Sequence, residues 1–419
     1  MGVNWNFSFP ENERTQDVLI VCVLSLIALV TRAYGIWEWP ITGDEYFTIA
    51  NVEERATGII GSAYYILVGI SQTFFGETTW SARLPAVVLG VLGIPAFYLM
   101  CKRLFNRRAA TIGCVFIILS EWHLYHSQMA RFYSGVFLFG AISYYFFYAS
   151  LKDNSYAYLF GSLFSSLLAV SFHATSIFIV VSCGIFSAFF LLYSWGRKVE
   201  FSKSVAGVYL SLCVLSAVAL LPKLISIAGE WGTGYGGLTA DVLSTMLGMV
   251  ENMGVIIFVS SFVGLLYLLF VDLNKFYLLV ILVLVPIVSL FVLSVVLPPA
   301  RPRYLFYSLP LFFALSSFFC GDMAGRVGGY FGSNAGLALV FSCVMGVSFI
   351  SHYTGKMSLD VGDPAKFVEE NYKENDRVIV FGWSIKNQLN NEVDVSLIKS
   401  KSFWDEKLVP IAEKEGRTW

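Results

Sequence analysis

The feature that most constrains this sequence is a succession of apolar runs, many close to 20 residues long, separated by short polar segments. A helix needs about 20 apolar residues to cross a bilayer, and an isolated spanning segment must satisfy its backbone hydrogen bonds internally. The runs therefore predict an all-α polytopic membrane protein with about eleven transmembrane helices. The predicted spans are residues 17–36, 82–101, 109–121, 132–150, 157–172, 174–195, 204–223, 252–271, 276–297, 303–320 and 335–352.

The composition agrees with this fold class. Only 14% of the 419 residues are charged, whereas a soluble domain has about a quarter of its residues charged. Most of the surface is therefore expected to face membrane lipid. The formal net charge of −1 argues against nucleic acid as a partner, because nucleic-acid binding needs a basic patch. The seven cysteines lie in or beside apolar runs and form no Cys-X-X-Cys pair, so we interpret them as small core residues.

Lysine and arginine predict the orientation, because short loops rich in them stay on the cytoplasmic side. One alternating set of loops carries Lys102, Arg103, Arg107, Arg108, Lys152, Arg197, Lys198, Lys203, Lys275 and Arg326. With eleven spans, the N-terminus is then cytoplasmic and the C-terminus extracytoplasmic. The first 16 residues are polar and acidic, unlike a signal peptide, so we expect the first span to be retained as an anchor. The expected location is the cell membrane, with the ER membrane as the alternative.

The chain divides into a membrane domain, residues 1–352, and a tail, residues 353–419. Residues 62–75 are apolar but too short for a span, which suits a helix in the outer membrane interface. The tail predicts a small extracytoplasmic α/β appendage, with an amphipathic helix followed by a strand at 377–381. Truncation at Trp419 stays open, because the sequence stops soon after that strand. The loops expected outside are 37–81, 122–131, 224–251 and 298–302.

The most informative stretch follows the first span and contains the adjacent acids Asp44 and Glu45. One interpretation is structural: Asp44 caps a helix and Glu45 interacts favourably with its dipole, after a turn at Gly43. The other is functional, with one acid acting as general base or metal ligand in a partly desolvated cavity. Neighbours on a helix point about 100° apart, so only one of the two is expected to face a site.

The second outer loop concentrates polar side chains between two apolar runs: Glu121, His123, His126, Gln128 and Arg131. Ionisable groups at that depth tend to line a cavity, although an interfacial anchor is the simpler interpretation of each one alone. His173, in a turn between two spans, is either a site residue or a satisfied interfacial histidine, and we favour the interfacial interpretation.

A third cluster places Arg301 and Arg303 at the outer mouth of the tenth span. Guanidinium forks suit phosphate, and arginine on the outer side runs against the charge bias of the other loops. Arg83 and Lys223 are further cations at outer span ends. A lipid-phosphate substrate suits this set of residues, because one acid can activate a hydroxyl and several cations can hold a phosphate. The sequence contains no nucleophile elbow, phosphate-binding loop, zincin helix or Cys/His zinc pattern.

In these residues and their order along the chain, the sequence resembles the GT-C glycosyltransferases. The similarity is to the branch of protein O-mannosyltransferases and aminoarabinose transferases, which use polyprenyl-phosphate sugars. The matching stretches are residues 43–50, 74–110, 119–134 and 302–315, in the family's order. The start of the tail resembles the outer appendage that many members carry. The resemblance implies a GT-C fold with the active site in the outer loops.

The resemblance also implies roles for single residues. Asp44 takes the position of the family's catalytic base, Glu45 completes its Asp-Glu pair, and Arg303 takes the position of the arginine that contacts the lipid phosphate. Family members commonly read Gln-Glu-Ala-Arg in the second outer loop, where this chain has Gln-Met-Ala-Arg at 128–131. The usual second acid is thus replaced by Met129, which puts a bridging metal in question.

A divalent metal therefore stays open, with Asp44 as the only good candidate ligand. Glu121 or His126 could replace the missing acid, but neither is in register.

We predict an inverting glycosyltransferase that moves a sugar from a polyprenyl-phosphate donor, dolichyl or undecaprenyl, to a hydroxyl on a protein, lipid or glycan. Asp44 deprotonates the acceptor, and the lipid phosphate leaves toward Arg303, assisted by Arg301 or Lys223. Arg83 is a further phosphate-binding candidate, and the expected supporting residues are Glu45, His126, Gln128 and Arg131.

Two alternatives remain open. A flippase of lipid-linked sugars needs access from both faces, and no pair of interrupted spans at the bilayer midplane is evident. A non-catalytic scaffold would tolerate the loss of the second acid at Met129.

Overall fold

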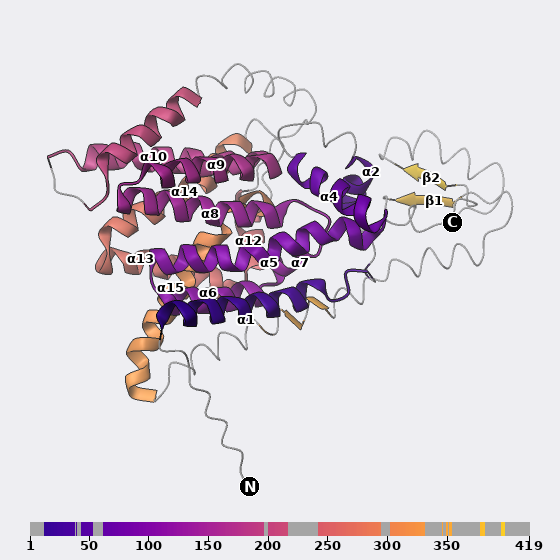
Figure 1. Ribbon diagram of the computed structural model, residues 1–419, viewed down its shortest axis with the longest axis horizontal. Helices are drawn as coiled ribbons and strands as arrows, with labels where there is room; N and C mark the ends of the chain where they lie inside the picture. Colours follow the sequence, from indigo (N-terminus) through magenta and orange to yellow (C-terminus); the bar gives the residue numbers. More distant parts are fainter. Residues whose placement is uncertain are drawn as a thin grey trace, which may run out of the picture.

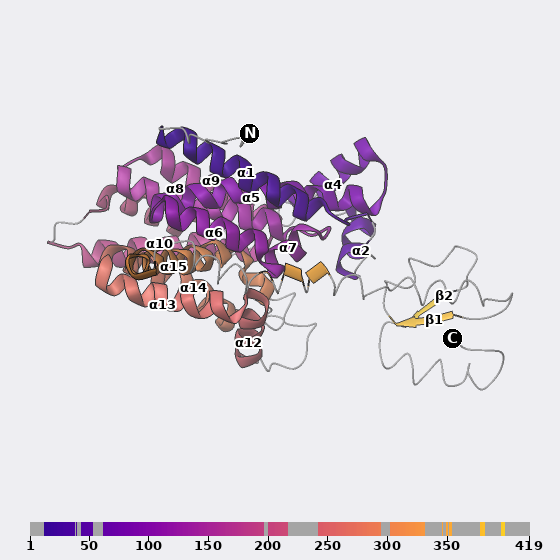
Figure 2. The same cartoon turned by 90° about the horizontal axis from the view of Figure 1, so that it is seen from below.

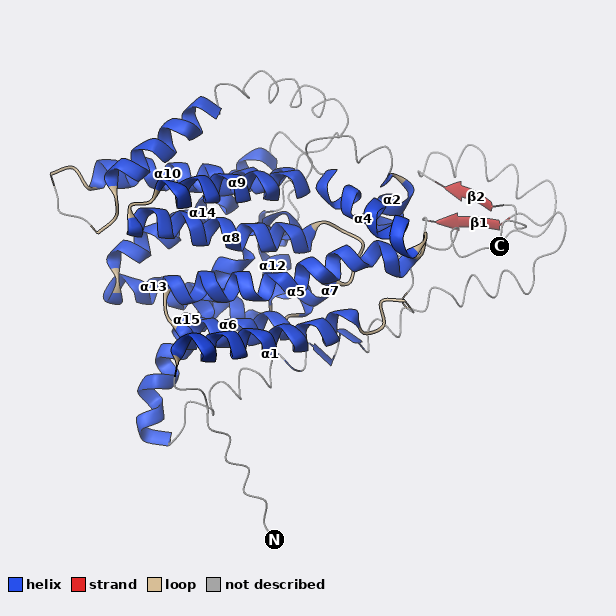
Figure 3. Ribbon diagram, viewed as in Figure 1, coloured by secondary structure: helices blue, strands red, loops and turns tan. Residues whose placement is uncertain are grey.

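The computed structural model describes residues 12–37, 39, 43–52, 62–196, 200–216, 242–294 and 302–331, with 346, 349–350, 352–353, 378–381 and 395–398. Apart from two short strands, the regular structure of these residues is helical (Figures 1 and 3). The longer helices lie side by side in one bundle: α1 (Glu13–Ala33), α5 (Thr79–Leu104), α6 (Arg107–Leu119), α8 (Tyr133–Asp153), α9 (Tyr156–Phe172), α10 (Ile177–Tyr193), α13 (Val255–Val271), α14 (Leu273–Ser294) and α15 (Leu309–Phe331).

The predicted fold class is confirmed at the level of an all-α membrane bundle. Within the described residues, five helices are long and apolar enough to cross a membrane, or six if one bent pair counts as a single span. The five are Glu13–Ala33, Thr79–Leu104, Tyr133–Asp153, Ala174–Tyr193 and Pro302–Met323. Shorter apolar helices lie at Tyr156–Phe172, Lys203–Ser216 and Leu273–Ser289. The count of eleven stays a prediction, because most of the expected span at 335–352 lies outside the described residues.

The predicted span at 252–271 corresponds to helix α13, which begins three residues later, at Val255. Helix α12 (Val242–Met253) meets α13 at Gly254, which has φ 83°, and the two helix axes differ by 105°. A glycine at this position allows the left-handed backbone conformation without steric strain. One interrupted segment is found among the described residues, whereas inverted-repeat transporters carry two in corresponding positions.

Small and hydroxyl-bearing residues let the helices approach closely. A Cβ added to Gly264 of α13 would lie 2.5 Å from the backbone oxygen of Leu315 on α15. The hydroxyls of Ser260 and Ser316 are 2.6 Å apart across the same helix pair. Packing of small residues and hydroxyl hydrogen bonds drives helix association where lipid removes the hydrophobic driving force. Glycine and serine thus define the α13–α15 contact.

The short helices α2 (Gly43–Ala50), α4 (Ser62–Phe75) and α7 (Glu121–Ser127) gather at one end of the bundle, here called the α2 end (Figures 1 and 2). Helix α4 has the predicted bounds, and an apolar stripe on it is exposed at Ile66, Ile70 and Phe74. The predicted outer connection at 122–131 contains most of α7, which Ser120 caps by accepting a hydrogen bond from the backbone N–H of His123.

The tail is described only in part. The predicted strand at 377–381 is observed as β1 (Val378–Phe381), which pairs in parallel with β2 (Val395–Ile398). The amphipathic helix expected before it lies outside the described residues. An α/β appendage therefore stays a prediction beyond these two strands.

Candidate active site

Helix α2 carries both acids of the first outer loop. It begins at Gly43, so Asp44 and Glu45 occupy its first turn, and the expectation that Asp44 caps this helix is wrong. The two carboxylates point to different partners, as expected for neighbours on a helix. Asp44 contacts Arg303, and Glu45 contacts Arg83.

The Asp44–Arg303 pair joins residues that lie 259 positions apart in the chain. The NH1 group of Arg303 donates to the Asp44 Oδ2 oxygen at 2.8 Å. Arg303 lies in η2 (Pro302–Ser308), a 3₁₀ helix that leads directly into α15. The Asp44 side chain is 40% exposed and that of Arg303 is 30% exposed, so a ligand can reach both.

The Glu45–Arg83 pair is buried. Arg83 donates from Nε and NH2 to the two Glu45 oxygens at 2.7 and 2.9 Å, and the side chains are 2% and 1% exposed. The Ala130 backbone N–H also donates to Glu45, at 2.8 Å. Arg83 NH1 donates to the carbonyls of Ile36 and Trp39. This geometry ties α5 to both outer loops and leaves the Arg83 guanidinium buried, so we assign it a structural role in place of the predicted phosphate contact.

Arg131 also contacts Asp44, through the backbone of that residue. Its NH1 group donates to the Asp44 backbone oxygen at 3.3 Å and to the Thr48 hydroxyl at 3.1 Å. Its guanidinium carbon lies 4.7 Å from the centre of the Phe132 ring. Among the described residues, the buried Nε atoms of Arg131 and Arg303 have no hydrogen-bond partner. Two guanidiniums with unused donors thus contact the same residue, Arg303 at the Asp44 carboxylate and Arg131 at its backbone oxygen.

Gln128 and His126 act through packing and backbone contacts. The Gln128 side-chain amide donates to the carbonyls of Thr31, Arg32 and Tyr34, and so fixes the end of α1. His126 is buried, and its ring centre lies 4.4 Å from that of Tyr133. Both predicted supporting residues hold the loop that carries Arg131.

Met129 is also buried, at 5% exposure. The position of the family's second acid is thus filled by an apolar side chain.

Sequence reasoning gave no role to a buried pair at the end of α1. Arg32 is 0% exposed and donates to the Ile117 carbonyl at 3.2 Å, and its NH2 lies 3.0 Å from Nδ1 of His123. Burial first, and then the Arg32 charge, lower the pKa of His123 well below its usual value. The His123 imidazole is therefore neutral and can accept from the guanidinium. The sequence signal that could have indicated this pair is Arg32 itself, an arginine inside the first apolar run.

His173 is a second residue whose role sequence reasoning missed. It follows α9 and is stacked between Phe132 and Tyr304, with ring centres 4.7 and 5.5 Å away. Burial, together with the charges of Arg131 and Arg303, lowers its pKa to about 4. The imidazole is therefore neutral near pH 7, beside both guanidiniums.

The described donor set does not fit a resident divalent metal. No group of three or more His, Cys, Asp or Glu side chains in the described part of the chain is close enough to hold an ion. Asp44 shares its carboxylate with Arg303, and the neighbouring Glu45 is committed to Arg83. No catalytic step is therefore derived through a metal. Arg301 and Lys223, two further predicted phosphate contacts, lie outside the described residues.

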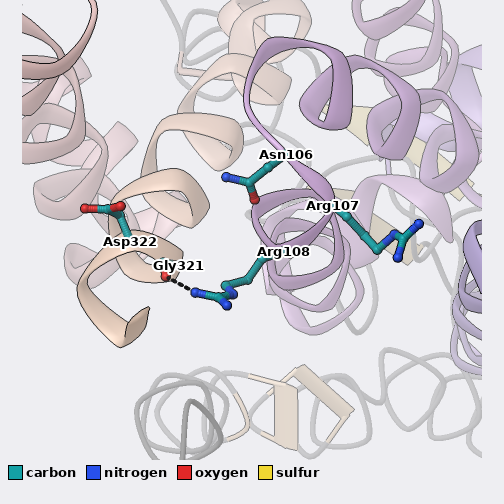
Figure 4. A pocket seen from close by; sticks show the side chains of 5 residues that line it. All are labelled: Asn106, Arg107, Arg108, Gly321 and Asp322. Carbon is teal, nitrogen blue, oxygen red and sulfur yellow. Dashed lines mark hydrogen bonds between the residues drawn. The ribbon is translucent and has the colours of Figure 1, made fainter. Parts of the chain in front are cut away.

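A separate cavity of about 320 Å³ lies away from this site, between α6 and α15 (Figure 4). It is lined by Asn106, Arg107, Arg108, Gly321 and Asp322. Arg108 donates to the Gly321 carbonyl at 3.4 Å, and Arg107 donates from Nε to Asp17 of α1 at 2.6 Å. The basic loops predicted to be cytoplasmic thus form helix contacts at the opposite end from α2.

Comparison with known proteins agrees with the sequence resemblance. Residues 63–225 match the family described as dolichyl-phosphate-mannose-protein mannosyltransferase, so the predicted relationship is confirmed. No protein of curated function matches the chain by sequence.

Solved structures share the fold. ArnT from Cupriavidus metallidurans bound to undecaprenyl phosphate has a TM-score of 0.59 at 11% identity, covering 96% of this chain and 89% of that one. The apo state of the same protein has a TM-score of 0.57 at 11% identity, covering 95% and 88%. The Archaeoglobus fulgidus oligosaccharyltransferase AglB, in complex with an inhibitory peptide and a dolichol-phosphate, has a TM-score of 0.55 at 13% identity, covering 88% and 63%.

Proposed function

We propose that the chain is an inverting, polyprenyl-phosphate-sugar-dependent glycosyltransferase, because residues 63–225 match the dolichyl-phosphate-mannose-protein mannosyltransferase family. The donor sugar is carried by a polyprenyl phosphate, and the acceptor is a hydroxyl on the extracytoplasmic side. The structurally similar ArnT was solved with undecaprenyl phosphate, and AglB with dolichol-phosphate, which supports this donor class.

The observation that carries the proposal is the pairing of Asp44 with Arg303. The resemblance assigned the base to one and the phosphate contact to the other, and the fold brings them to 2.8 Å. The base and the phosphate-binding cation must flank the same anomeric carbon in this reaction, because the acceptor oxygen attacks the face opposite the bond to the departing phosphate. Arg131 adds a second cation, which contacts the backbone oxygen of Asp44.

In this mechanism, binding of the donor frees the Asp44 carboxylate from Arg303. The Arg303 guanidinium occupies an oxygen of Asp44, so that oxygen is not free to accept a hydrogen bond from an acceptor hydroxyl. An incoming lipid phosphate competes for Arg303, since bidentate phosphate pairing is a strong interaction for a guanidinium. Asp44 is then available to accept the proton of the acceptor hydroxyl. The base becomes fully active only when the donor is bound.

The chemical step is then an in-line displacement. The acceptor oxygen forms a bond to the anomeric carbon while the bond from that carbon to the phosphate oxygen breaks. The acceptor proton moves to Asp44, and the new negative charge on the phosphate is stabilised by Arg303 and Arg131. A single displacement inverts the anomeric configuration. The Glu45–Arg83 pair supports the step by fixing α2 against α5.

The experiment is a donor assay on the purified full-length protein. Detergent-solubilised wild type and Asp44→Asn are incubated with a panel of polyprenyl-phosphate sugars and a crude acceptor extract, and released polyprenyl phosphate is measured by mass spectrometry. We expect release by the wild type and a loss of about 10²- to 10⁴-fold in the variant. Donor binding without release would favour a scaffold or a flippase, and translocation in liposomes would separate those two.

A further inference from the structure

The two guanidiniums of the candidate site are connected by a stack of aromatic rings. The Arg131 guanidinium lies over Phe132, with its carbon 4.7 Å from the ring centre. Phe132 stacks on His173 at 4.7 Å with 28° between the planes, and His173 stacks on Tyr304 at 5.5 Å with 29°. Tyr304 is the residue that follows Arg303. The order of layers is therefore Arg131, Phe132, His173 and Tyr304, with Arg303 adjoining the last.

Hydrogen bonds hold the central ring in place. The Thr175 hydroxyl donates to the Tyr304 carbonyl at 2.9 Å, and its oxygen lies 2.7 Å from Nδ1 of His173. A hydroxyl has one hydrogen to donate, so Nδ1–H of the imidazole donates to Thr175. The Thr175 backbone N–H also approaches Nδ1, but at 3.4 Å this contact is too long to compete. His173 is thus fixed to the backbone beside Arg303 by a chain of two hydrogen bonds.

We propose that His173 is a positioning residue, whose neutral ring sets the separation between the Arg131 and Arg303 guanidiniums so that both can hold the donor phosphate. This inference rests on the proposed function. The three ring-bearing residues come from three separate segments of the chain, the second outer loop, the turn after α9 and η2, so no single helix fixes their spacing.

A charged or smaller side chain at this position would change the spacing. A second cationic group between two guanidiniums repels both, and burial already disfavours the charged imidazole. A side chain without a ring leaves a layer of the stack empty, and Phe132 and Tyr304 can then approach each other. Either change moves one guanidinium relative to the other. The loss of one charge-assisted contact to phosphate corresponds to about 10- to 100-fold in affinity.

Two variants separate the effect of the His173 ring from that of its hydrogen bond, and a third variant is the control. His173→Asn keeps a donor near Thr175 but removes the ring, whereas His173→Phe keeps the ring and removes the donor. Ser176→Ala is the matched control, because Ser176 is buried in the same 3₁₀ turn and its hydroxyl has no hydrogen-bond partner among the described residues. Equilibrium binding of radiolabelled undecaprenyl phosphate is measured on the full-length protein in detergent, together with thermal unfolding.

The expected result is at least about tenfold weaker binding by His173→Asn and rescue to within about threefold of wild type by His173→Phe. Ser176→Ala should bind like wild type. The positioning role is overturned if His173→Asn binds as tightly as wild type. It is also overturned if His173→Phe restores the unfolding temperature but not the affinity. A folded wild type that binds neither undecaprenyl phosphate nor, in the same assay, dolichyl phosphate would instead overturn the proposed function, and this inference with it.

Discussion

Replacing Glu45 by Gln tests how the site is held together. The substitution keeps the shape of the side chain but removes its charge, so the Arg83 guanidinium, 2% exposed, loses its carboxylate partner. Removing one partner of a buried ion pair destabilises a protein by about 3–5 kcal/mol, because the remaining charge stays buried without compensation. Total stabilities are about 5–15 kcal/mol, so this single change should remove a large part of the folding free energy.

The assay uses cysteine reactivity. Cys101, Cys114 and Cys183 are buried and become reactive toward a fluorescent maleimide as the helices separate. The control is Arg103→Ala, which breaks the pair with Asp153, whose side chains are 38% and 39% exposed. An exposed pair contributes about 0–1 kcal/mol, so this control should unfold close to the wild-type temperature. The reasoning is refuted if Glu45→Gln is no less stable than Arg103→Ala.

Three further predictions concern the donor, pH and metal. Arg303→Lys keeps the charge but loses the planar fork, so we expect a donor KM raised by about tenfold or more in initial-rate assays, and an unchanged KM would exclude a bidentate phosphate contact. Burial lowers the folded-state pKa of His173 from 6.5 to about 4, so the unfolded chain binds more protons between these values. The contribution of His173 to the folding free energy is then fully present above pH 6.5 and declines by up to about 3 kcal/mol as pH falls toward 4. Unfolding of His173→Phe, measured at pH 7.5 and 5, should show a smaller pH dependence than unfolding of the wild type. Dialysis against EDTA should leave turnover unchanged, because the described donor set does not fit a metal, and restoration of lost activity by added Mn²⁺ or Mg²⁺ would contradict that conclusion.

The membrane class and the two principal site residues could be predicted from sequence for physical reasons. Apolar runs report the length of a bilayer crossing directly, and acids placed between such runs are rare enough to attract attention. The resemblance then identified Asp44 and Arg303, which the structure brings into contact.

The partners of the remaining charges could not be predicted, because they depend on tertiary contacts. Arg83 is an ordinary cation at the end of a span in the sequence, and only the fold shows that Glu45 pairs with it. His173 looks like a single interfacial residue until Phe132 and Tyr304 are brought to its two faces. The bend at Gly254 was also missed, because α12 lies in residues that the sequence analysis assigned to an outer loop.

The most direct test of the central claim measures donor binding and turnover on the same preparation of Asp44→Asn. In the proposed mechanism, Asp44, which pairs with Arg303, competes with the donor phosphate for that arginine and also serves as the base. The account therefore predicts turnover lowered by about 10²- to 10⁴-fold together with undecaprenyl-phosphate binding that is equal to or tighter than that of wild type. Weaker binding with most of the turnover retained would contradict the account, because Asp44 would then assist binding and not catalysis.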